Sequence, residues 1–232
     1  MKLDYISASK IKTLQDCKKL FYHTYIAKDL PETEDGIYAQ LGSGLHKVLE
    51  VWRHDPSLTR REMVGIFREN FPPGKDHYLF KEACGMIYDL DLKKIKRGDL
   101  IATEKEFETE ISGVKVKGVI DKLEKVGNKI LVTDYKTNKQ IEPAEYIHQL
   151  AIYDAIVEQW YPDIEREHEL LYLRHNKSVA FTFTDIGRQN LVGILNTVNE
   201  MVDKNAENKL AWPKINTKAK QCSYCPFAKE CW

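Results

Sequence analysis

Residues 114–136 of this 232-residue chain have the pattern of a β-hairpin, and this stretch constrains the fold more than any other. Apolar residues recur on both sides of a Gly127-Asn128 dipeptide, which is typical of a two-residue turn between antiparallel strands. The pattern predicts strands over 114–126 and 129–136. The chain is therefore expected to contain a sheet that includes this hairpin.

Two carboxylates and an ammonium group gather on this hairpin. Asp121 and Asp134 lie at corresponding depths of the two strands. Because a strand repeats its facing every two residues, Asp134 and Lys136 leave the same face and Tyr135 points away. Carboxylates on a rigid sheet suit Mg²⁺, which acidifies bound water and neutralises charge on phosphate, while Lys136 can orient that water. The alternative is a surface ion pair between Asp134 and Lys136.

Two predicted helices carry further polar residues. A helix over 142–160, opened by Pro143, follows the hairpin, and within it Gln149 and Tyr153 are four residues apart and share one face. A helix over 37–54 precedes the hairpin and carries His46 beside its apolar stripe. There His46 can ligate a metal or contact DNA phosphate, although a lone helical histidine is more often structural.

Together these residues resemble the PD-(D/E)XK nucleases, specifically their RecB-like exonuclease branch. The resemblance covers about positions 40 to 155. The matching residues are His46 in Gly-Leu-His-Lys-Val-Leu-Glu, Asp121 in Gly-Val-Ile-Asp, Asp134 and Lys136 in Asp-Tyr-Lys-Thr, and Gln149 with Tyr153 in Gln-Leu-Ala-Ile-Tyr. The resemblance implies an α/β fold with a restriction-endonuclease-like core, in which helices flank a mixed sheet, and a DNA exonuclease that depends on Mg²⁺ or Mn²⁺.

The resemblance also implies a role for each residue. Lys136 assists the attacking water, and Gln149 and Tyr153 support the site or contact DNA. Glu104 matches an acidic position of the family more weakly. The implied metal ligands are His46, Asp121, Asp134 and the backbone carbonyl of Tyr135.

The five cysteines are a second, independent signal. Cys222, Cys225 and Cys231 form a C-x2-C-x5-C pattern in the last eleven residues, and Cys17 lies on a predicted first helix, facing inward. Disulfides explain them poorly because the count is odd and no signal peptide is evident. Four thiolates suit either zinc or a 4Fe-4S cluster, although this one-plus-three spacing is less typical of zinc. Cys84 is expected to be a buried small hydrophobe.

The one-plus-three cysteine arrangement looks like the iron-sulfur staple of RecB-like members such as the AddB subunit of helicase-nucleases and the CRISPR-associated adaptation exonucleases. On that resemblance Cys17, Cys222, Cys225 and Cys231 bind the cluster. The cluster would join residues 1–30 and 207–232 into one module of a single nuclease domain, whose core is residues 37–206.

Composition limits the partners. The 35 basic and 35 acidic residues balance, so DNA must be bound by local patches rather than by a global positive field. No apolar run is long enough to span a bilayer, which predicts no membrane contact and a cytoplasmic location. An assembly subunit of a recombination, CRISPR adaptation or viral DNA-processing complex is the alternative to an enzyme. The candidate patches, each of which can also be a solvated face, are Lys10, Lys12, Lys18 and Lys19; Lys93, Lys94, Lys96 and Arg97; and Lys214, Lys218 and Lys220.

Hydrophobic periodicity predicts the remaining elements. The last helix, over 186–206, is expected to be capped by Asp185. The other predicted helices cover 7–27, 59–70 and 77–97, and the other predicted strands cover 101–111, 167–174 and 179–184.

Overall fold

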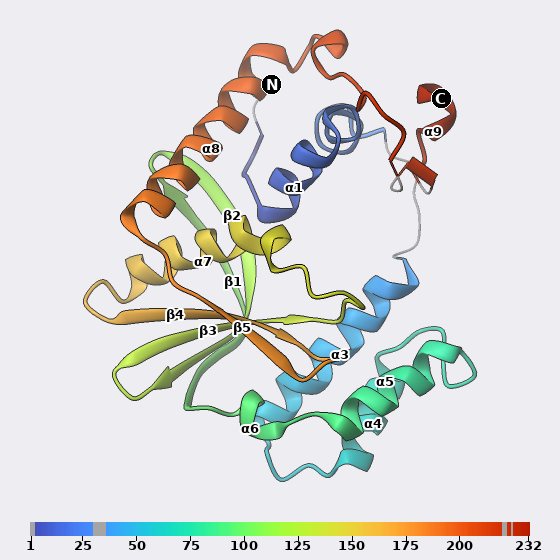
Figure 1. The fold of residues 1–232 in the computed structure, drawn as a ribbon, viewed down its shortest axis with the longest axis vertical. Helices are drawn as coiled ribbons and strands as arrows, with labels where there is room; N and C mark the ends of the chain where they lie inside the picture. The colour runs from blue at the N-terminus through green and yellow to red at the C-terminus, as the bar shows by residue number, and fades with distance from the viewer. Residues whose placement is uncertain (1–2, 30–35, 220–221, 224) are drawn as a thin grey trace.

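A five-stranded mixed sheet forms the centre of the protein in a computed structural model that describes residues 3–29, 36–219, 222–223 and 225–232 (Figure 1). The strand order is β1-β2-β3-β4-β5, and β3 pairs with β4 in parallel while the other pairs are antiparallel. The strands are β1 Asp99–Ile111, β2 Val114–Val126, β3 Lys129–Lys136, β4 Glu165–Tyr172 and β5 Lys177–Phe181. This α/β fold is consistent with a restriction-endonuclease-like core.

The predicted hairpin is confirmed as β2 and β3, with Lys122 opposite Thr133 and Val126 opposite Lys129. Gly127 has a φ of +60°, which explains why the turn needs a glycine. A 3-10 turn, Pro143–Tyr146, leads from β3 into helix α7, Ile147–Trp160. This helix is the crossover that a parallel β3–β4 pair requires.

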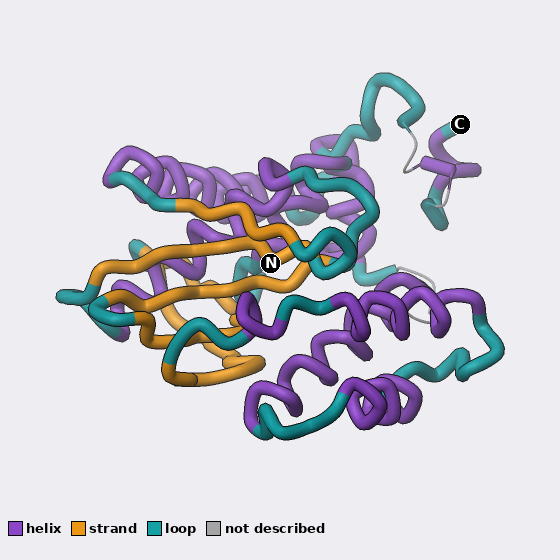
Figure 2. The backbone as a smooth tube through the Cα atoms, turned by 60° about the horizontal axis from the view of Figure 1, so that its bottom comes forward, coloured by secondary structure: helices purple, strands orange, loops and turns teal. Residues whose placement is uncertain are grey.

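Helices lie on both faces of the sheet (Figure 2). Two hydrophobic cores lie between the helices and the sheet. One face packs against α1, Ala8–Asp16, together with α7 and α8, Asp185–Asn205. The opposite face packs against α3, Ile37–His54, and the second core continues into the smaller helices α4 Arg60–Glu69, α5 Tyr78–Asp89 and α6 Leu92–Ile95. None of the helices described is long and apolar enough to cross a membrane.

A buried charge network attaches α3 to β2. Lys122 and Glu124 lie under the helix, and the Lys122 Nζ to Glu124 Oε2 distance is 2.7 Å. Arg53 of α3 places Nη2 2.7 Å from Glu124 Oε1. Because a buried carboxylate is costly without such partners, this network fixes where α3 crosses the sheet. It thereby fixes His46, which lies two turns earlier on the same helix.

Two predicted helices are interrupted. The helix expected over 7–27 breaks at Cys17, whose φ of −163° and ψ of 112° are extended, and Cys17 Sγ then caps the next turn by accepting from Leu20 N at 3.5 Å. After this break come the short helix α2, Lys18–Phe21, and a π-helical turn, Tyr22–Ala27. The helix expected over 77–97 breaks at Leu90, where the backbone is also extended, with φ −53° and ψ 129°.

Three side-chain predictions are wrong. Thr184 caps α8, because its side chain accepts a hydrogen bond from Gly187 N, and Asp185 lies in the first turn. Cys84 is half-buried, not fully buried as expected, whereas the inward facing of Cys17, also half-buried, stays a prediction. Lys10 is buried instead of facing DNA, since its Nζ donates to the Tyr5 carbonyl and lies 3.4 Å from the centre of the Tyr5 ring.

Candidate active site

Asp121 and Asp134 have buried side chains, and Asp134 lies on the sheet face that α7 covers, where Gln149 donates to it. Tyr135 N donates to Asp121 Oδ2 at 2.7 Å, a contact across the hairpin that holds this carboxylate in place. Asp134 Oδ2 lies 2.6 Å from Lys136 Nζ. Tyr135 projects into the core on the opposite face, so the facing expected from the strand period is confirmed.

Helix α7 holds Lys136 in position. Lys136 Nζ donates to Gln149 Oε1 at 3.0 Å, and it lies 4.0 Å from the centre of the Tyr146 ring. Gln149 Nε2 donates to Asp134 Oδ1 at 2.8 Å and to Tyr153 Oη at 2.7 Å. Tyr153 donates in turn to the carbonyl of Val119. A continuous chain of hydrogen bonds therefore connects Lys136 of β3 to the neighbouring strand β2 through side chains of α7.

His46 reaches the same centre from α3. Its Nδ1 is 3.6 Å from Asp121 Oδ2 and 3.5 Å from Glu104 Oε1. Its Nε2 is 3.1 Å from the carbonyl of Tyr135, and because a carbonyl only accepts, Nε2 carries a hydrogen. Nδ1 is then the nitrogen that faces the acidic groups, and in the neutral ring it has a free lone pair for a metal.

Glu104 reaches this centre through an unusual backbone conformation. Its φ is +44°, although it is not a glycine and lies within β1. The register of β1 also shifts between Leu100 and Ala102. Such a conformation costs roughly 1–3 kcal/mol and is concentrated at functional sites. No sequence signal reports this conformation, and Glu104 could be found only through its weak match to a family position.

Among the described residues, one group of possible metal ligands has its atoms all within 4.8 Å of one another: His46, Glu104 and Asp121. Asp134 is beside this group, but it interacts instead with Lys136 and Gln149. Carboxylate oxygens, a carbonyl and one imidazole nitrogen fit a hard divalent cation such as Mg²⁺ or Mn²⁺. The donor set of this centre therefore fits the expected metal.

The electrostatics of the centre also favour a cation. Burial raises the pKa of Asp121 to about 7, and repulsion from Asp134 adds to this effect. Burial acts to lower the pKa of His46, but the negative charge of Asp121 and the hydrogen bond to Glu104 outweigh it and raise that pKa to about 9. The negative carboxylates thus favour the protonated form of His46, and Asp121 and Asp134 repel each other when both are ionised. A bound divalent cation would reduce this repulsion between the carboxylates.

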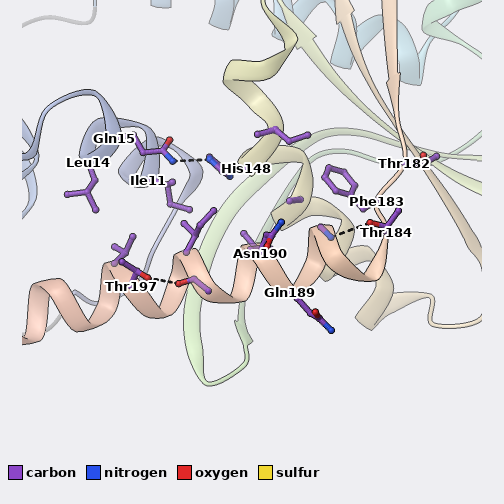
Figure 3. A pocket seen from close by; sticks show the side chains of 17 residues that line it. Ile11, Leu14, Gln15, His148, Thr182, Phe183, Thr184, Gln189, Asn190 and Thr197 are labelled. Carbon is purple, nitrogen blue, oxygen red and sulfur yellow. Dashed lines mark hydrogen bonds between the residues drawn. The ribbon is translucent and has the colours of Figure 1, made fainter.

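Two cavities lie near α1, and they differ in their linings. A cavity of about 420 Å³ opens onto Asp121, Gln149 and Tyr153, so solvent and substrate can reach the centre there. A larger cavity of about 880 Å³ lies between α1, α7 and α8, and its lining is mainly apolar with hydroxyl and amide groups (Figure 3). None of the acidic site residues lines the larger cavity.

Residues 5–232 match the family model described as the PD-(D/E)XK nuclease superfamily. The chain belongs to this superfamily. The "Putative exonuclease" from Eubacterium rectale, a crystal structure, shares 15% identity with this PD-(D/E)XK chain, covers 95% of this chain and 88% of its own, and has a TM-score of 0.61. A solved structure described as SSO0001 shares 16% identity over 96% of this chain and 94% of its own, with a TM-score of 0.31, too low to support an argument. No curated protein matches the chain.

The cysteine region of this PD-(D/E)XK protein lies where the two ends of the chain meet. Lys19 N donates to the carbonyl of Pro213 at 3.2 Å, and the rings of His23 and Phe227 stack with centres 4.1 Å apart. Burial raises the pKa of the Cys225 thiol, and the charges of the other three predicted ligands raise it further. No three of the described cysteines, however, have sulfur atoms all within 4.8 Å of one another. The predicted cluster stays a prediction.

Several side chains of the predicted basic patches contact groups within the protein. Lys12 pairs with Asp16, Arg97 with Glu169, and Lys94 donates to the carbonyl of Asn176. Lys214 Nζ lies 3.8 Å from the centre of the Trp232 ring. Lys220 is outside the described residues.

Proposed function

We propose that this PD-(D/E)XK protein is a DNA exonuclease that depends on Mg²⁺ or Mn²⁺ and hydrolyses phosphodiester bonds at single strands or DNA ends. One observation carries the proposal. Lys136 Nζ is held 2.6 Å from Asp134 Oδ2 and 3.0 Å from Gln149 Oε1, and the charge of Asp134 acts on both Asp121 and His46. A surface ion pair needs no such surroundings, whereas hydrolysis of phosphate needs a fixed cation beside a metal site.

In this proposal His46, Asp121, Asp134 and the carbonyl of Tyr135 hold the metal, with Glu104 as an additional acidic ligand. When bound, the ion lowers the pKa of a water molecule and neutralises charge on the phosphate. Lys136 orients that water through Nζ and stabilises negative charge that develops on the phosphate. Gln149 holds the Lys136 side chain in position by accepting a hydrogen bond from Nζ. Tyr153 in turn holds the Gln149 side chain in position by accepting a hydrogen bond from it.

Cleavage of end-labelled DNA tests this function. Single- and double-stranded substrates labelled at either end are incubated with Mg²⁺ or Mn²⁺, and the product ladders report activity, polarity and strand preference. We expect Lys136→Ala to lower the rate by about 10²–10³-fold. Lys125→Ala, at an exposed lysine of the same hairpin, is the matched control and should leave the rate unchanged. Equal cleavage by wild type and Lys136→Ala would overturn the proposal. No cleavage by wild type would favour an assembly subunit.

We also propose that Cys17, Cys222, Cys225 and Cys231 bind a 4Fe-4S cluster. The supporting observations are the packing of the two chain ends and the electrostatic effect of Cys17, Cys222 and Cys231 on the Cys225 thiol. A tetrahedral zinc ion with Zn–S bonds of about 2.3 Å would bring all four sulfur atoms within about 4 Å of one another, whereas no three of these sulfur atoms lie mutually within 4.8 Å. A four-iron cluster separates its thiolates more widely because several irons stand between them.

Anaerobic purification followed by visible spectroscopy and iron analysis tests the cluster. Wild type should be brown and contain iron, and Cys225→Ser should lose both properties. Cys84→Ser is the matched control and should keep them. A colourless protein that contains zinc would contradict the cluster without affecting the proposed nuclease centre.

A further inference from the structure

Two exposed tyrosines meet beside the candidate active site. Tyr38 is at the start of α3 and Tyr78 is at the start of α5, and their hydroxyl groups are 3.1 Å apart. The two residues remain 52% and 61% exposed, respectively. Exposed aromatic rings lower the solubility of a protein. Two such rings that contact each other can instead provide a flat surface on which a planar ligand stacks.

Positive charge accompanies these rings. Lys139 Nζ is 5.8 Å from the centre of the Tyr38 ring, and Arg174 lines a cavity of about 420 Å³ with Tyr38 and Lys139. The hydrogen bond with Tyr78, followed by the charge of Lys139, lowers the pKa of the Tyr38 hydroxyl, so both cations and the neighbouring ring act on the same group. Arg174 is itself held by Glu82 and by the carbonyl of Thr137.

This cavity adjoins the catalytic centre along two elements. Thr137 and Lys139 continue the chain directly beyond Lys136 of β3. On α3, Tyr38, Gly42 and His46 are spaced by four residues and follow one side of the helix, which separates Tyr38 from His46 by about 12 Å along its axis. Gly42 presents no side chain between them, and a Cβ there would lie 3.6 Å from Thr137 Oγ1.

We propose that Tyr38 and Tyr78 form a stacking platform for the bases of an unpaired nucleic-acid strand, with Lys139 and Arg174 near its phosphates. A duplex keeps its base faces covered, whereas an unpaired strand exposes them to aromatic side chains. The 12 Å path is about three to four nucleotides at the 3.4 Å spacing of a helical strand. The inference rests on the proposed function for where cleavage occurs, but the binding that it describes is measurable without cleavage.

Binding of the full-length protein to fluorescently labelled oligothymidylate in EDTA tests the platform. We expect Tyr38→Ala and Tyr78→Ala each to weaken binding about 5- to 150-fold, the range that loss of one base–aromatic stack gives. Binding to a duplex of equal length should change little. Tyr88→Ala is the matched control, because Tyr88 is on the same helix as Tyr78 and is 57% exposed.

Abasic scanning identifies the stacked bases. Removing one base at a time should weaken binding to wild type at one or two positions, and this loss should disappear in the Tyr38→Ala/Tyr78→Ala variant. Tyr38→Phe, which keeps the ring but loses the hydroxyl contact with Tyr78, should keep most of the binding that Tyr38→Ala loses. Unchanged single-strand binding by both alanine variants, or equal losses for single strand and duplex, would overturn the platform. If wild type binds as expected but cleaves no DNA, only the proposed function fails.

Discussion

The catalytic centre and the cysteine region differ in how much of their geometry exists without a bound metal. His46, Glu104 and Asp121 already bring ligand atoms within 4.8 Å, because strands β1 and β2 and helix α3 are fixed by two cores and a buried charge network. The cysteines lie on a break between short helices and on a tail of short turns. A site on rigid elements is preorganised, whereas a site on short segments acquires its final geometry from its metal.

Preorganisation has an energetic cost that the cysteine region avoids. The catalytic centre holds Asp121 with a pKa of about 7 and Glu104 with a φ of +44°. The two regions should therefore respond in opposite ways when a ligand is removed. The catalytic centre should lose activity and gain stability, and the cysteine region should lose structure.

Asp121→Asn gives the largest expected effect. An asparagine oxygen can still accept from Tyr135 N, so the fold should persist while cleavage falls by at least about 10²–10³-fold. The folded pKa of Asp121 lies above its unfolded value of 3.8, so its stabilising contribution is present below pH 3.8 and is lost as pH rises through about 7. At pH 9 without metal, the free energy of unfolding of Asp121→Asn should therefore exceed that of wild type by on the order of 1 kcal/mol. Denaturant titration measures this difference.

The effect of Mg²⁺ on the melting temperature shows whether the Asp121→Asn result arises at the metal site or from a general change in the stability of the protein. The ion should raise the melting temperature of wild type and leave that of Asp121→Asn unchanged. A variant that is less stable than wild type at pH 9 would show that Asp121 contributes mainly to the fold, and the comparison between the two regions would fail.

Cys222→Ser should produce the opposite outcome. Loss of the cluster should release the tail from the first helices, so amide hydrogens near Phe227 and Trp212 should exchange faster by several hundredfold or more. Exchange in β2 and β3 should stay slow, because the sheet has its own cores. Cys84→Ser should leave exchange unchanged at both places. Faster exchange throughout the sheet would mean that the cluster stabilises the whole domain.

The hairpin and its functional face could be predicted because their signals are local. Gly127 ends one strand and begins another, and the period of two places Asp134 and Lys136 on one face. Breaks at Cys17 and Leu90 could not be predicted, because the apolar periodicity continues across both and only tertiary contacts select an extended residue.

Long-range features were likewise hidden. The burial of Lys122 and Glu124 depends on Arg53, which is about seventy residues away in the chain. Charged residues at inward positions of an apolar strand were the available signal. The approach of Glu104 to His46 depends on one left-handed residue that no local pattern encodes.

Metal binding at the catalytic centre should depend on pH. With pKa values of about 9 for His46 and about 7 for Asp121, both groups must be deprotonated before they can ligate a cation. The apparent affinity for Mn²⁺ should rise up to about tenfold per pH unit between pH 7 and 9, and more steeply below pH 7. Calorimetry in two buffers with different ionisation enthalpies should detect release of about one proton at pH 8.

The same titration identifies the residue that releases the proton. His46→Gln should abolish most of the proton release at pH 8 while leaving Asp121 in place. The thiolates of the proposed cluster should contribute no protons, because they would stay bound to iron during the titration. Binding of Mn²⁺ without proton release would show that the cation binds outside the group formed by His46, Glu104 and Asp121.

Tyr153→Phe should have the smallest effect and measures how far preorganisation extends from the metal ligands. Phenylalanine keeps the buried ring and its edge contact with Phe107, but it removes the hydroxyl that connects Gln149 to the carbonyl of Val119. The free energy of unfolding should fall by about 1 kcal/mol, and the cleavage rate by less than about tenfold. Mn²⁺ affinity should change by less than about threefold, because Tyr153 reaches the proposed ligand Asp134 only through Gln149. A loss as large as that of Lys136→Ala would instead mean that Tyr153 contacts the substrate itself.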